Sequence, residues 1–131
     1  MTKNGNGSQQ DNCIQKSATK HTSNNPLERV RNLNDQLRRT GTGGMIVMTR
    51  GIEALEASIR GEVFQAVQCY DDFNLDNDPY TEHDFGKLKV RGHKIFWKID
   101  YYAPDLIHGS ADPANADGTT RILTVMLAHE Y

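Results

Sequence analysis

The sequence has little of what secreted, membrane-spanning or zinc-binding proteins require. Its 131 residues include two cysteines, Cys13 and Cys69, which are too few for a disulfide framework or a zinc site. The longest apolar stretch, Ile122 to Ala128, falls far short of the roughly 20 residues that span a bilayer. No apolar segment follows Lys3, so the pattern of a signal peptide is missing as well. We therefore expect a cytoplasmic protein without a membrane partner.

Large apolar residues are also scarce at the N-terminus. Residues 1–24 are rich in Asn, Gln, Ser, Thr, Gly and Lys, and Ile14 is the only large aliphatic residue among them. Such a segment cannot bury enough apolar surface to offset the entropy lost on ordering. The sequence thus predicts a disordered polar tail over residues 1–24 and a single α+β domain over residues 25–131.

The negative charges are concentrated in one segment. The net charge is only −2, but Tyr70 to Gly86 contains six carboxylates and neither Lys nor Arg. A segment this acidic is repelled by bare nucleic-acid phosphates and suits a basic protein surface instead. We therefore predict that the segment contacts a protein partner through Asp71, Asp72, Asp76, Asp78, Tyr80, Glu82 and Asp84.

Two segments show the spacing of apolar residues that is typical of helices. The first begins after Asn25, a good N-terminal cap that is followed by Pro26, and should end at Gly41. The second is capped by Ser58 and continues to about Tyr70. In the first helix the apolar positions are Leu27, Val30, Leu33 and Leu37.

Four segments are expected to form strands. Met45–Thr49 is almost entirely apolar, which is typical of a buried strand. Phe85–Arg91 and Lys94–Tyr102 flank a two-residue loop, Gly92-His93, with glycine first as a type II′ turn prefers. The last strand, Arg121–Glu130, is apolar on both faces and should be central in the sheet.

The hairpin loop also predicts which residues pair. It pairs Gly86 with Ile99, Leu88 with Trp97 and Val90 with Ile95, so that these residues form one apolar face. On the other face it places Lys87 opposite Lys98 and Phe85 opposite Asp100. The complete order is α-β-α-β-β-β, and we predict an α+β fold in which a mainly antiparallel sheet of about four strands packs against two helices.

The acidic segment loosely matches a calcium-binding loop, but two required positions are wrong. Counted from Asp76, such a loop needs glycine at position six and glutamate at position twelve. This chain has Thr81 and Lys87 there. We therefore expect neither a metal ion nor a cofactor.

An enzymatic alternative uses side chains from the same region. Glu82, His83 and Asp84 precede the hairpin, whose predicted pairing brings Asp100 close to them. Such groups support hydrolysis in a metal-dependent hydrolase or nuclease. The other interpretation is that the aspartates cap turns and that His83 is structural. We favour the structural interpretation because the sequence offers neither a third defined metal ligand nor a nucleophile.

The predicted hairpin has a basic face opposite its apolar one. Its cationic residues are Lys87, Lys89, Arg91, Lys94 and Lys98. Phe85 and Phe96 lie among them and are able to stack on bases, so this face suits a nucleic acid. The chain's own acidic segment is an equally suitable cover, and lysines that simply face water are the commonest reason for such a pattern.

Several motifs are familiar in combination. They include Leu33-Asn34-Asp35, Asp71-Asp72-Phe73, Asn77-Asp78-Pro79-Tyr80, Glu82-His83-Asp84-Phe85-Gly86, Phe96-Trp97-Lys98-Ile99-Asp100-Tyr101-Tyr102 and the segment from Thr120 to Tyr131. On these motifs the chain, outside its first residues, resembles an uncharacterised family of small proteobacterial proteins that is catalogued as a domain of unknown function. The family usually has two acidic residues where this chain has His129 and Glu130, which argues against a catalytic role for His129.

The resemblance implies a setting rather than an activity. Members of the family are often carried by plasmids, phages and integrative elements, near genes that counter host defences, and no catalytic residues can be transferred from them. With the acidic segment, this leads us to expect a non-enzymatic protein of a mobile genetic element. It would inhibit a host defence effector complex, in the manner of an anti-CRISPR or anti-restriction protein. The hydrolase or nuclease and the nucleic-acid-binding module remain the alternatives, and the oligomeric state stays open.

Overall fold

The structure, a computed structural model, describes residues 25–131, and the predicted disordered tail lies outside the described residues. The regular elements are α2 (Pro26–Thr40), β1 (Met45–Met48), α3 (Arg50–Glu53), α4 (Ala57–Gln68), β2 (Phe85–Val90), β3 (His93–Tyr102), η1 (Ala116–Gly118), β4 (Thr120–Leu127) and η2 (Ala128–Glu130). This order of helices and strands confirms the predicted α+β class.

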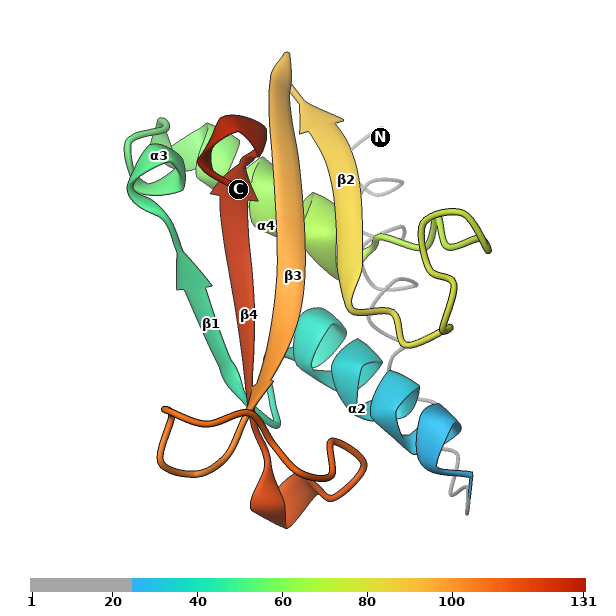
Figure 1. Cartoon of the computed structure of the whole chain (residues 1–131). Helices are drawn as coiled ribbons and strands as arrows, with labels where there is room; N and C mark the ends of the chain where they lie inside the picture. Colours follow the sequence, from blue (N-terminus) through green and yellow to red (C-terminus); the bar gives the residue numbers. More distant parts are fainter. Residues whose placement is uncertain (1–24) are drawn as a thin grey trace.

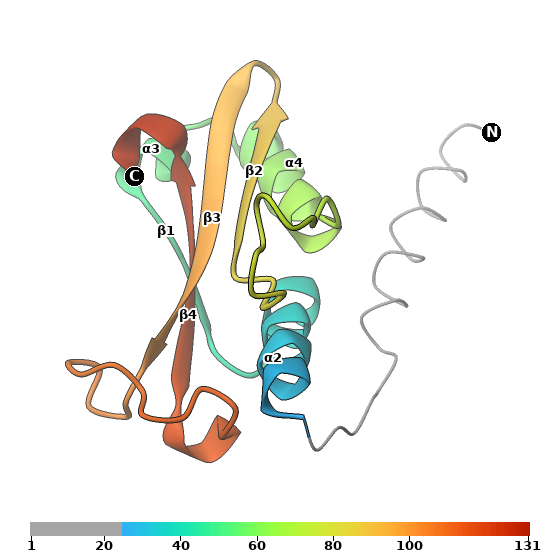
Figure 2. The same cartoon turned by 45° about the vertical axis from the view of Figure 1, so that its right-hand side comes forward.

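One four-stranded sheet organises the described residues, in the order β1-β4-β3-β2. β3 runs antiparallel to both β2 and β4, whereas β1 pairs with β4 in parallel, so the sheet is mixed. Helices α2 and α4 cover one face of the sheet (Figures 1 and 2). No long helix of residues 25–131 covers the opposite face, which we call the open face.

The first helix follows the sequence signals closely. The side chain of Asn25 accepts hydrogen bonds from the backbone of Leu27 and Glu28, and Gly41 ends the helix in a left-handed conformation. The second long helix, α4, begins before the predicted cap. Glu56 occupies the cap position without a side-chain hydrogen bond, so the prediction of Ser58 as the cap is wrong.

The core lies between the sheet and the two long helices. Ile95, Trp97 and Ile99 of β3 are buried together with Leu123 and Val125 of β4. The inward orientation predicted for the apolar face of the hairpin is therefore confirmed. The central position predicted for the last strand is confirmed as well, since β4 lies between β1 and β3.

The predicted pairing of the hairpin is wrong by two residues. The turn consists of Arg91 and Gly92, both with positive φ, so Gly86 pairs with Trp97 and Lys87 with Phe96. A Cβ atom on Gly86 would collide with the indole of Trp97. This register therefore places the one β2 residue without a side chain beside the largest ring of the core. A shift of two residues leaves every side chain on its predicted face.

The predicted buried strand near residue 45 is instead an edge strand. Within the part of the chain that the structure describes, β1 has only β4 as a neighbour. Exposure is between 38 and 45 % for each of its residues, Met45, Ile46, Val47 and Met48. The apolar pattern identified a strand correctly but gave the wrong environment, because the pattern does not reveal which strand has a second neighbour.

Candidate functional site

The acidic segment forms a structured loop between α4 and β2, which we call the acidic loop (Asp71–Asp84). Its first half is a tight turn made by two asparagines. The side-chain oxygen of Asn74 accepts hydrogen bonds from the backbone of Asp76 and Asn77, and the side-chain amide of Asn77 donates to the carbonyl of Asp72 at 2.8 Å. These bonds hold the turn in one conformation without burying it.

Asp78 is an internal anchor of the loop. Its side chain is only 4 % exposed, and one of its oxygens accepts hydrogen bonds from the backbone of Glu82 and His83. Thr81 and His83 both adopt positive φ, which is unusual for residues other than glycine. The bonds to Asp78 thus hold the chain in a sharp reversal before β2 begins.

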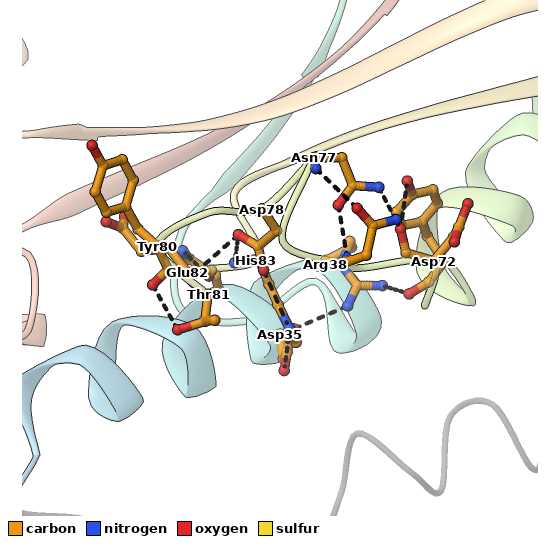
Figure 3. A network of polar contacts seen from close by, with 12 residues as sticks. Asp35, Arg38, Asp72, Asn77, Asp78, Tyr80, Thr81, Glu82 and His83 are labelled. Carbon is orange, nitrogen blue, oxygen red and sulfur yellow. Dashed lines mark hydrogen bonds and ion pairs between the residues drawn. The ribbon is translucent and has the colours of Figure 1, made fainter.

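His83 connects the loop to α2. Its Nδ1 lies 2.9 Å from an oxygen of Asp35, and its Nε2 lies 3.6 Å from an oxygen of Asp78 (Figure 3). The imidazole also stacks on the ring of Phe73, with the two ring centres 3.8 Å apart. Burial acts to raise the pKa of Asp35, but the hydrogen bond and charge of His83, together with Arg38, outweigh it and lower that pKa.

Arg38 fixes the start of the loop from the same helix. Its fully buried guanidinium donates to the carbonyls of Val67, Gln68 and Tyr70, where α4 ends, and forms an ion pair with Asp35 at 3.0 Å. Carbonyls in the last turn of a helix lack the full set of helical donors, and the arginine supplies a donor to each of these three. Burial is the main reason that the pKa of Arg38 is lowered.

A second polar network holds the end of the loop. The hydroxyl of Tyr101 donates to the carboxylate of Glu82 at 2.7 Å, and the side-chain amide of Asn34 donates to that hydroxyl and to the carbonyl of Glu82. The buried guanidinium of Arg121 in turn donates to the side-chain oxygen of Asn34. Burial, followed by the hydrogen bond to Glu82, raises the pKa of Tyr101 far above its usual value. Glu82 is therefore held mainly by internal contacts.

The outer surface of the loop is both acidic and apolar. Asp71, Asp72 and Asp76 are exposed on it. Two large side chains accompany them, since Leu75 is 75 % and Tyr80 73 % exposed. Of the seven residues predicted to contact a partner, the structure thus exposes four on the loop surface, directs Asp78 inward and partly buries Glu82 and Asp84.

Of the four residues of the enzymatic alternative, Asp84 lies near Glu82, and the other three have different partners. Glu82 contacts Tyr101, His83 lies between two aspartates, and Asp100 forms an ion pair with Lys98 at 2.8 Å. Asp100 is not across from Phe85, because Phe85 pairs with Lys98. Within residues 25–131 no group of three or more His, Cys, Asp or Glu side chains is arranged to hold a metal ion.

Four of the five residues predicted for the basic face lie on the open face of the sheet. They are Lys87 and Lys89 of β2 and Lys94 and Lys98 of β3. The fifth, Arg91, lies in the turn and makes two hydrogen bonds to Glu62 of α4. Lys87 was predicted to face Lys98, but it pairs with Phe96 instead, and its ammonium lies 5.8 Å from the centre of that ring. The directly opposed lysines are Lys89 and Lys94.

These features define an α+β protein in which a mixed sheet and two helices support a fixed acidic loop. The chain belongs to a family described as "Protein of unknown function (DUF3768)", whose model matches residues 48–130. The matched part contains the acidic loop, the hairpin and β4, whereas α2 with Asn34, Asp35 and Arg38 precedes it. No curated protein and no solved structure matches the chain. None of the helices among the described residues is long and apolar enough to cross a bilayer.

Sequence reasoning missed the residues that hold the loop in place. Asn34 and Arg38 occupy buried positions of a helix that was expected to bury only apolar side chains. The available signal was that both fall close to the apolar stripe, one position after Leu33 and Leu37. Apart from Asp35, their partners lie more than 25 residues away in the chain, so no local pattern could identify them.

Proposed function

We propose that this protein acts by binding rather than by catalysis, and that the acidic loop docks onto a basic surface of a partner protein. The observation that carries the proposal is the combination of three exposed aspartates with Leu75 and Tyr80 on a loop that the buried Asp78 holds by hydrogen bonds. In this proposal the partner contacts are Asp71, Asp72, Asp76, Leu75 and Tyr80.

The rigidity of the loop supports a binding role. Asp78, the two asparagines and Arg38 already hold the backbone in place, so a partner need not order it on binding. Preorganisation of this kind lowers the entropy cost of association. Tyrosine is enriched among the residues that dominate binding energy, and carboxylates on the rim speed the encounter with a basic surface.

The partner we propose is a host defence effector that uses a basic cleft to hold DNA or RNA. Carboxylates presented by a fixed loop compete for such a cleft by charge, which would make the protein an inhibitor of the anti-CRISPR or anti-restriction type, acting in the cytoplasm for a mobile element. The charge that matters is local, because the whole chain carries a net charge of only −2.

Charge reversal on the loop tests the proposal. Wild-type protein and an Asp72→Lys/Asp76→Lys variant would be incubated with a panel of purified RNA-guided nucleases and restriction enzymes, and both binding and inhibition of DNA cleavage would be measured. The variant should lose at least about tenfold in affinity, with the loss becoming smaller at high salt. Tyr80→Ala should also weaken binding, but with unchanged salt dependence.

The matched control is Glu53→Lys/Asp117→Lys, which makes the same change in net charge at two exposed carboxylates outside the acidic loop. It should bind and inhibit like the wild type. If no effector in the panel forms a complex with the wild-type protein, or if the loop variants bind as tightly as the control, the proposed function is wrong.

A further inference from the structure

A second surface of the molecule has the opposite charge and a different shape. The open face of the sheet carries Lys87, Lys89, Lys94 and Lys98, and three aromatic residues lie among them. We propose that this face binds single-stranded nucleic acid, with the lysines on the phosphates and exposed aromatic rings stacked on the bases. The proposal concerns a different surface and a different ligand from the acidic loop, and it does not depend on the proposed function.

The charge of the open face is unbalanced. Asp100 is the only carboxylate on the β2 and β3 positions that face outward, and it already forms an ion pair with Lys98. Lys87, Lys89 and Lys94 are exposed, and among residues 25–131 no carboxylate forms an ion pair with them. Because Lys89 and Lys94 stand directly opposite each other, their repulsion disfavours the hairpin. A bound anion would remove that repulsion, so the face is complementary to a polyanion.

The aromatic side chains add a feature that simple charge would not require. Phe85, Phe96 and Tyr131 form a cluster, with ring centres between 5.5 and 5.9 Å apart. Tyr131 is the outermost of the three, since its side chain is 74 % exposed. Lys87 lies over the ring of Phe96, so a cation and an aromatic platform are adjacent. Bases stack on such rings while neighbouring lysines follow the backbone.

The shape of the face favours single strands over duplexes. Reading the major groove requires a helix or a protruding β-ribbon, whereas these lysines lie across the surface of two paired strands. Stacking on a sheet surface requires unpaired bases. The acidic loop does not oppose a nucleic acid here, since it packs against α2 on the other side of the sheet (Figure 2).

Lys89→Glu provides a test that separates binding from folding. The substitution places a carboxylate opposite Lys94, so the protein should melt at the same or a higher temperature. Its affinity for single-stranded nucleic acid should nevertheless fall by about three- to tenfold at low salt, because a phosphate contact is replaced by a repulsive charge. Tyr131→Ala should weaken binding at every salt concentration without changing the salt dependence.

The measurement is fluorescence anisotropy with labelled oligo(dT) and oligo(U) of twelve nucleotides, using the full chain at several salt concentrations, with a hairpin duplex and poly-glutamate as competitors. Arg29→Glu makes the same change in net charge at an exposed site on α2 and should bind like the wild type. Three outcomes would overturn the proposal: no binding by the wild-type protein, an equal loss in Lys89→Glu and Arg29→Glu, or competition by the duplex or poly-glutamate as effective as by the unlabelled single strand.

Discussion

Arg38 joins three parts of the molecule that are far apart in the sequence. It lies on α2, its guanidinium binds the carbonyls at the end of α4, and its flat side packs near the rings of Phe73 and Trp97. A buried arginine of this kind is costly to remove, because three carbonyls each lose one hydrogen bond and Asp35 loses an ion pair.

Replacing Arg38 should therefore destabilise the whole domain. We expect Arg38→Met to lower the free energy of unfolding by about 3–5 kcal/mol, or to prevent folding. Arg29→Met, on the exposed side of the same helix, should change it by less than about 0.5 kcal/mol. Chemical denaturation followed by circular dichroism measures both, and equal small effects would show that the buried contacts contribute little.

Two aspartates near the loop should respond to pH in opposite ways. The pKa of Asp35 is lowered in the folded protein, so its charge stabilises the fold above the unfolded pKa of 3.8, and this contribution is lost as the pH falls through the folded value. The pKa of Asp84 is raised, mainly by burial and then by the nearby Glu82. Its contribution is favourable below 3.8 and is lost as the pH rises through the folded value.

Neutral substitutions at the two positions test these signs. At pH 7, Asp35→Asn should lower the melting temperature and Asp84→Asn should raise it. The difference for Asp84→Asn should shrink as the pH falls through the raised pKa and vanish below 3.8, whereas that for Asp35→Asn should shrink only once the pH falls below 3.8. Thermal melts over this pH range provide the measurement. A fall in melting temperature for Asp84→Asn at pH 7 would contradict the assigned direction.

At the level of elements, the sequence predicted the strands better than their partners. The alternation of apolar residues was enough to orient the hairpin, so Ile95, Trp97 and Ile99 point inward as expected. The register was not predictable from the turn alone, because Gly92 suits either the predicted loop Gly92-His93 or the observed loop Arg91-Gly92. The position of Trp97 beside Gly86 decides between them, and that contact joins two strands rather than neighbours in sequence.

Two glycines in different elements should respond to alanine in opposite directions. Gly92 in the hairpin turn has φ of +84°, a conformation that alanine adopts at a cost of about 1–2 kcal/mol. Gly61 in α4 has open space where a Cβ atom would be placed, and alanine there should stabilise the helix by about 0.5–1 kcal/mol. Urea denaturation of Gly92→Ala and Gly61→Ala checks both values. If both substitutions raised, or both lowered, the free energy of unfolding, the turn or the helix would differ from the one described.

For the whole molecule, the composition indicated the size of the fold, but it did not indicate that the acidic and basic surfaces lie on different sides. Both charged surfaces come from one stretch of chain, with the acidic loop directly before the lysines of the hairpin. They separate because Asp35 and Arg38 draw the loop onto α2 while the lysines alternate to the open face. The helix contacts were invisible in the sequence because they connect residues that are remote along the chain.

The edge of the sheet yields the last prediction at this scale. β1 exposes apolar side chains on both of its faces, and it has none of the lysines, prolines or bulges that usually protect an edge strand from pairing with another chain. Such an edge promotes self-association, so we expect the apparent mass in solution to rise with protein concentration. Val47→Lys, which places a charge on this edge at a site that is 38 % exposed, should reduce that rise.

Leu75→Lys is the matched control, because Leu75 is more exposed but lies on the acidic loop rather than at a strand edge. Sedimentation velocity over a range of concentrations distinguishes the two: an equal reduction by both variants would assign the association to general surface hydrophobicity instead of to the unpaired edge.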